Sequence, residues 1–168
     1  HPKPVNPMQG AIFIWLTDRE KWDQETYRAL TPQIVAFEHL KQANGNQAEA
    51  RAWITQGRLP YEVVTSAIKP DVDTWAELMR QMPYFALLRH LNTLQSAGVL
   101  RDPDHAKYVA ERLSNQEALR KAKILPFRLF MAYRMFNRTA PAENLVSEAL
   151  VEAMDMAFVN LPDLGGSI

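Results

Sequence analysis

The segment from Met82 to Leu100 combines an apolar helical stripe with a polar face that suits a phosphate or a base. On a helix, Arg89, Asn92 and Ser96 share one side, because they stand at positions i, i+3 and i+7. A guanidinium followed one turn later by an amide can donate to a phosphate oxygen or to a base edge. The alternative is an ordinary amphipathic helix whose polar face contacts only water.

A second segment, from Glu117 to Arg138, is rich in cations and aromatic rings. Four of its cations surround a helix–proline–helix junction: Arg120, Lys121, Lys123 and Arg128. Three arginines fall within about a third of the circumference of the helix that follows: Arg128, Arg134 and Arg138. A basic junction beside a helix N-terminus favours phosphate binding.

The same helix carries four aromatic residues whose faces could stack on bases: Phe127, Phe130, Tyr133 and Phe136. Aromatic residues at helical spacing are usually part of a core, so we expect most of these rings to be buried.

The charge of the chain is balanced in total but not along its length. The 168 residues have a formal net charge of zero. Lys and Arg number 11 against 12 Asp and Glu in residues 1–106, 8 against 2 in residues 107–138, and none against 5 in residues 139–168. A polyanion responds to a local patch rather than to the total charge, so the basic block is a candidate surface for a polyanion. The alternative is that solvated helix faces happen to share a sign.

No segment has the spacing of a catalytic or metal-binding motif. P-loop, dinucleotide-loop, zinc-protease and nucleophile-elbow patterns are absent from the sequence. The histidines are scattered without ligand spacing: His1, His39, His90 and His105. We therefore expect no enzyme activity, no metal ion and no cofactor in this chain, with a nucleophile–base pair assembled by the fold as the alternative.

Cysteine is absent, which fits a reducing compartment, and a cytoplasmic location is the expectation. The longest apolar stretch near the start, Gly10 to Leu16, is too short to span a bilayer, so no membrane partner is expected.

Helix-start and helix-stop signals recur along the whole chain, and no segment alternates for long with the period of a strand. The predicted helices are Gln9–Leu16, Pro32–Ala43, Gln47–Gln56, Tyr61–Ala67, Thr74–Met82, Tyr84–Ala97, a helix that starts at Asp102 or Pro103 and runs to Leu113, Ser114–Lys123, Phe127–Asn137 and Ala142–Phe158. Gly57 is predicted to stop one helix, and Thr74 and Ser114 to begin capping boxes. Short helices must bury their apolar faces on neighbours, which predicts an α-solenoid of helical hairpins or an irregular bundle.

Several motifs together resemble the hallmarks of one family. They are Met82-Pro83, Ala86–Leu91, Gly98–Leu100, Arg112–Phe127 and Leu59-Pro60. This pattern resembles the TROVE domain, the RNA-binding module of the Ro autoantigen family, and specifically the C-terminal part of that domain. The resemblance is strongest over residues 58–136.

The resemblance implies an all-α, HEAT-like solenoid or ring of antiparallel helical hairpins, of which residues 1–158 would be a fragment. Residues 159–168 would be a linker towards a von Willebrand factor A-like domain that is absent from this sequence. The family binds small non-coding Y RNAs and single-stranded ends of structured or misfolded RNA. An exoribonuclease reached through the RNA is a further expected partner.

The candidate RNA-binding residues are Arg89, His90, Asn92, Arg120, Lys121, Lys123, Arg128 and Arg134. Two positions depart from the family pattern. His90 stands where the family has asparagine, and Leu125 stands where it has histidine, which removes one polar RNA-facing group. The alternative function is a helical protein-interaction scaffold with weak or no RNA binding.

Overall fold

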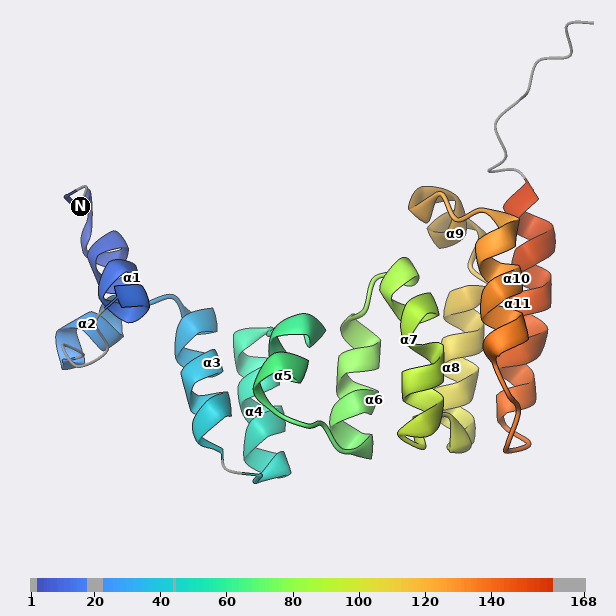
Figure 1. Ribbon diagram of the computed structural model, residues 1–168, viewed down its shortest axis with the longest axis horizontal. Helices are drawn as coiled ribbons and strands as arrows, with labels where there is room; N and C mark the ends of the chain where they lie inside the picture. Colours follow the sequence, from blue (N-terminus) through green and yellow to red (C-terminus); the bar gives the residue numbers. More distant parts are fainter. Residues whose placement is uncertain (1–2, 18–22, 44, 159–168) are drawn as a thin grey trace, which may run out of the picture. The chain divides into compact units, whose positions relative to one another are not determined.

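The computed structural model describes residues 3–17, 23–43 and 45–158, and in these ranges the regular structure is helical without strands (Figure 1). The prediction of an all-α fold is therefore confirmed. The chain divides into two compact units, His1–Pro70 and Asp71–Ile168, and each is described by itself. The proposed linker at 159–168 lies outside the described residues. No helix within the described ranges is both long and apolar enough to cross a membrane.

The first unit contains α1 (Pro7–Thr17), α2 (Gln24–Ala29), α3 (Pro32–Gln42), α4 (Gln47–Gly57) and α5 (Tyr61–Ala67). The helices α3 and α4 form an antiparallel hairpin whose fully buried side chains include Leu40 and Ile54. The prediction that Gly57 stops α4 is wrong, because Gly57 is the last helical residue and Arg58 takes the left-handed conformation at φ 47°. Glycine is needed at this position because a Cβ would lie 2.3 Å from the Cβ of Ala36.

The second unit contains α6 (Val72–Gln81), α7 (Tyr84–Ser96), a 3-10 turn (Val99–Arg101), α8 (Pro103–Leu113), α9 (Gln116–Ala122), α10 (Pro126–Met135) and α11 (Glu143–Ala157). The helix α11 packs against both α8 and α10, and α10 also contacts α7 (Figure 1). Its core is made by fully buried side chains on these helices: Leu87, Leu94, Leu113, Leu119, Leu129, Val146 and Leu150. Burial of this apolar surface provides the main stabilisation of the unit.

Both predicted capping boxes are wrong by one or more residues. The helix α6 begins earlier than expected, with Asp71 as its N-cap accepting a hydrogen bond from the amide of Thr74, which is itself fully buried. The helix α9 is capped by Asn115 rather than Ser114. The Ser114 hydroxyl instead donates to the Glu152 carboxylate at 2.7 Å. Asp71 stands three residues before Thr74 and is the stronger capping residue type, whereas Asn115 directly follows Ser114 and is a cap of similar strength.

The start of α7 is held against α8 by side-chain bonds to backbone carbonyls. The hydroxyl of Tyr84 donates to the carbonyl of Leu113 at 2.9 Å, and its burial raises the pKa of Tyr84 well above the ordinary value. The guanidinium of Arg112 donates to the carbonyl of Met82 at 2.9 Å and to the hydroxyl of Tyr108 at 3.0 Å. These bonds fix the end of α7 that carries Phe85, the next residue along the chain.

Candidate nucleic-acid interface

The helix α7 presents two different faces because its apolar residues recur at helical spacing. Leu87, Leu91 and Leu94 are buried in the core of the second unit. Phe85 and Arg89 stand one turn apart on the exposed side, and Phe85 keeps 38% of its surface accessible. An exposed phenylalanine next to an exposed arginine is available for contact with a ligand.

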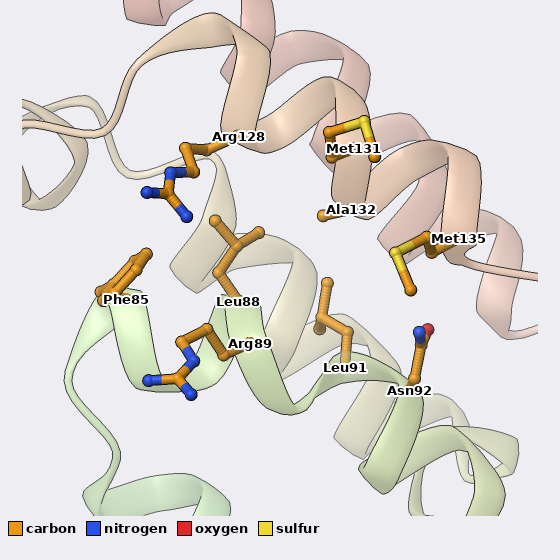
Figure 2. Close-up of a pocket in the computed structure, with 9 residues that line it drawn as sticks. All are labelled: Phe85, Leu88, Arg89, Leu91, Asn92, Arg128, Met131, Ala132 and Met135. Carbon is orange, nitrogen blue, oxygen red and sulfur yellow. The ribbon is translucent and has the colours of Figure 1, made fainter.

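A groove of about 230 Å³ lies between α7 and α10 (Figure 2). Its walls are formed by Phe85, Leu88, Arg89, Leu91 and Asn92 of α7 and by Arg128, Met131, Ala132 and Met135 of α10. Figure 2 shows the arginines at the end marked by Phe85, and Asn92 with Met135 at the opposite end. The groove is therefore cationic at one end, apolar in the middle and carries an amide at the other end.

Arg89 and Arg128 come from different helices and contact the same ring. Each guanidinium carbon lies 5.9 Å from the centroid of the Phe85 ring, within the range of a cation–π interaction. Both arginines are exposed, and within the described part of the chain neither guanidinium forms an ion pair or a hydrogen bond. Their positive charge is uncompensated by a carboxylate, and their N–H groups remain available to an anion.

The other two candidates on α7 lie in different surroundings. Asn92 is half-buried and lines the groove. His90 does not line it: its Nδ1–H donates to the carbonyl of Ala86 at 2.8 Å, and its ring lies 6.3 Å from that of Trp75. The structure therefore brings Arg89, Asn92 and Arg128 together and leaves His90 on another side of the helix.

Three cations that do not line the groove gather at the end of α9, and this cluster is called here the α9 junction. Arg120 and Lys121 are in the last turn, and Lys123 ends the helix in the left-handed conformation at φ 52°. All three side chains are exposed. Cations at a helix C-terminus also stabilise the helix through its dipole, which is a purely structural reason for their presence. Arg128, which the sequence groups with these three cations, lines the α7–α10 groove.

The aromatic residues of α10 are less buried than expected. Phe127 and Phe130 are 66% and 43% exposed, Tyr133 is half-buried, and only Phe136 belongs to the core. Arg134 lies over Phe130, with its guanidinium carbon 6.0 Å from the ring centroid. The expectation that most of these rings are core is wrong, because α10 buries only Leu129 and its C-cap Phe136 and leaves its other faces open.

Two cations of the basic block have partners within the chain. Arg112 is bonded to Met82 and Tyr108, as described above. Lys107 lies 4.0 Å from Glu111 in an exposed i,i+4 pair. The basic surface available to a polyanion is therefore smaller than the sequence count indicates.

One carboxylate of the acidic segment, that of Glu143, stabilises the fold. Glu143 is fully buried, and its carboxylate accepts hydrogen bonds from the amides of Thr139 at 2.6 Å and Ala140 at 3.1 Å. The side-chain amide of Gln95, on α7, donates to the same carboxylate at 2.8 Å and also to the carbonyl of Asn137. Burial opposes ionisation, but these hydrogen bonds outweigh it and lower the pKa of Glu143. Glu143 thus ties α7 to the segment that follows α10.

Sequence reasoning missed Phe85, Met131 and Met135 as parts of the site. A signal for them existed, because Phe85 precedes Arg89 by one turn and Arg128, Met131 and Met135 share the i, i+3, i+7 pattern. Spacing alone could not tell that this face of α10 is turned towards α7.

The comparisons with known proteins match the sequence of the chain to one family. A family model described as the TROVE domain matches residues 61–159, more than half of the chain. The chain therefore belongs to the TROVE domain family, as its motifs predict. A curated relative, the RNA-binding protein RO60 of Caenorhabditis elegans, is 25% identical over 164 residues that cover 92% of this chain and 25% of that protein. The chain spans about a quarter of the length of this relative.

Proposed function

We propose that this chain is an RNA-binding module of a Ro-type ribonucleoprotein that acts without catalysis. Its ligands are small non-coding RNAs of the Y type and the single-stranded ends of structured or misfolded RNA. The observation that carries the proposal is the α7–α10 groove, where Arg89 and Arg128 hold uncompensated charge over an exposed ring. Membership of the TROVE domain family and the RNA-binding relative support the same ligand class.

The proposed mechanism is electrostatic. Arginine and lysine side chains neutralise phosphates and release condensed counterions, which makes the affinity depend steeply on salt. The groove contributes Arg89 and Arg128, and the α9 junction contributes Arg120, Lys121 and Lys123, all of them exposed. Phosphate contacts of this kind position an RNA without reading its sequence.

Fluorescence anisotropy with a stem-loop RNA that bears a single-stranded 3′ tail tests the proposal at three salt concentrations. We expect tight binding at low salt, with log affinity falling against log salt at a slope of about −0.7 for each phosphate neutralised. The RNA should be recovered intact after prolonged incubation, since no chemistry is proposed. No binding at low salt by the folded chain would overturn the proposal.

Weak and salt-insensitive binding would instead favour a helical protein-interaction scaffold. The first unit has an apolar groove of about 510 Å³, lined by side chains that include Trp15, Phe37 and Val63. Apolar grooves between helices are typical of protein partners rather than of RNA. The two functions are therefore distinguished by the salt dependence of RNA binding.

The exoribonuclease expected as a partner would be held by the shared RNA. A pull-down of such a nuclease by the chain should then depend on added RNA. Association that survives removal of the RNA would contradict an RNA-bridged partnership.

A further inference from the structure

We propose that the α7–α10 groove binds a single unpaired nucleotide, with its phosphate held by Arg89 and Arg128 and its base against the apolar wall. This inference rests on the RNA-binding function proposed above and adds the geometry of one ligand unit. It assigns the groove to single-stranded RNA and leaves double-stranded segments to the exposed cations elsewhere.

The cationic end of the groove suits a phosphate. Two guanidiniums from two helices lie at one end, each 5.9 Å from the centroid of the Phe85 ring. Guanidinium is planar and donates through paired N–H groups, which match two oxygens of a phosphate. Packing on the ring limits the positions of both side chains, so less conformational entropy is lost when an anion binds.

The middle of the groove suits a base. Leu88 and Met131 supply apolar surface, and Met131 is 40% exposed on the opposite wall from α7. Thioether sulfur is polarisable and makes favourable contacts with aromatic rings. The volume of about 230 Å³ lies below the range of drug-sized pockets, roughly 300–1,000 Å³, and fits a small planar group.

The far end of the groove suits the edge of that base. Asn92 is half-buried there, beside Met135, and its amide can both donate and accept hydrogen bonds. Phe85 and Asn92 are seven residues apart on one helix, which corresponds to about 10 Å along the helix axis. The order of charge, apolar wall and amide therefore follows the order of phosphate, base face and base edge.

This order favours an unpaired nucleotide over other ligands. In a duplex the base faces are stacked and the pairing edges are occupied. Neither is therefore accessible to the apolar wall or to the Asn92 amide of the groove. The carboxylates of an acidic peptide would reach Arg89 and Arg128, but a run of acidic side chains has no planar apolar face to place against the wall between the two ends of the groove.

Affinities of the whole chain for three probes test the inference. The probes are a short labelled oligouridylate, an abasic ribose-phosphate oligomer of the same length and an RNA duplex of the same length. We expect the wild-type chain to bind the oligouridylate about tenfold more tightly than the abasic oligomer, because only the first can fill the slot with a base.

Two double variants separate the two ends of the groove. Arg89→Ala with Arg128→Ala should weaken binding of both single-stranded probes by about tenfold. Met131→Ser with Met135→Ser should weaken only the oligouridylate, so that the preference for bases disappears. Arg101→Ala is the matched control, since Arg101 is an exposed arginine of the same unit that does not line the groove. Thermal melts establish that each variant is folded.

The outcomes distinguish the nucleotide-site proposal from the proposed RNA-binding function. Loss of the base preference in the methionine variant, with normal melting, supports the nucleotide site. Normal RNA binding and an unchanged base preference in both variants would overturn this inference and leave the proposed function standing. Binding of an acidic peptide that depends on Arg89 and Arg128, with RNA binding unaffected, would also overturn it. Failure of the wild-type chain to bind any RNA at low salt would overturn the proposed function, and this inference with it.

Discussion

The α7–α10 groove and the α9 junction are both cationic, but they hold their charges differently. In the groove, Arg89 and Arg128 rest on one ring beside a cavity. At the junction, Arg120, Lys121 and Lys123 extend from the end of a short helix and are exposed. The groove is built to favour one geometry of ligand, whereas the junction supplies charge with little geometric preference.

The two surfaces are expected to control different properties of RNA binding. Diffuse exposed charge raises the rate and strength of polyanion binding and is screened by salt. Pre-positioned guanidiniums beside apolar surface add selectivity, because they reward a ligand with the matching shape. We therefore expect the junction to dominate total affinity and the groove to dominate the choice between single and double strands.

Charge reversal at the junction should give the largest effect. Arg120→Glu, Lys121→Glu and Lys123→Glu together should lower the affinity for a tailed stem-loop about 100-fold at low salt. The magnitude of the salt slope should fall by about 2, the value for three lost phosphate contacts on a single strand. Anisotropy measures both quantities, and circular dichroism checks the fold. Unchanged affinity would remove the junction from the RNA-binding surface.

Weakening the hydrogen bonds to the Glu143 carboxylate should give the next largest effect. Glu143→Gln keeps the shape of the buried side chain but replaces bonds to a carboxylate with weaker ones, which should destabilise the second unit by about 2 kcal/mol. Because Gln95 joins α7 to this carboxylate, binding of single strands should suffer more than binding of duplexes. Urea unfolding and the two affinities are the measurements.

The stability of the wild type and of Glu143→Gln should also differ in its pH dependence. The folded-state pKa of Glu143 is lowered, so the carboxylate stabilises the wild-type chain above the pKa of the unfolded state. That contribution is lost as the pH falls through the lowered pKa of the folded state. The stability difference between wild type and Glu143→Gln should therefore shrink on acidification, and a constant difference would contradict the assigned role.

Substitutions of arginine by lysine should have the smallest effect on affinity, and the effect should differ between the groove and the α9 junction. Arg89→Lys with Arg128→Lys keeps both charges but removes the planar fork, and should weaken binding of the oligouridylate about fivefold. Arg120→Lys should change it by less than about twofold, since the junction needs only charge. Equal responses at the two surfaces would contradict the distinction between them.

Much of the helical layout could be predicted from the sequence because its signals are local. Thr31 before Pro32 and Asp102 before Pro103 cap α3 and α8 as their residue types indicate. The role of Gly57 is not local, because it depends on Ala36 in another helix. The predicted start at Thr74 is wrong because Asp71, three residues earlier, is the stronger cap.

The site was only partly predictable for the same reason. Arg89 and Asn92 were found from helical spacing on one helix, and the structure places both in the groove. The partnership of Arg89 with Arg128 depends on how α10 lies against α7, which no local pattern encodes. The exposure of Phe127 and Phe130 likewise follows from which face of α10 is covered by α11 and α7, and not from their spacing.

Photo-crosslinking of a 4-thiouridine oligomer to the whole chain, mapped by mass spectrometry, tests the central claim most directly. The account predicts cross-links at Phe85, Met131 or Met135 that an unlabelled single strand competes away and an equal duplex does not. Cross-links confined to other parts of the chain, or none from a folded chain at low salt, would contradict RNA binding in the α7–α10 groove.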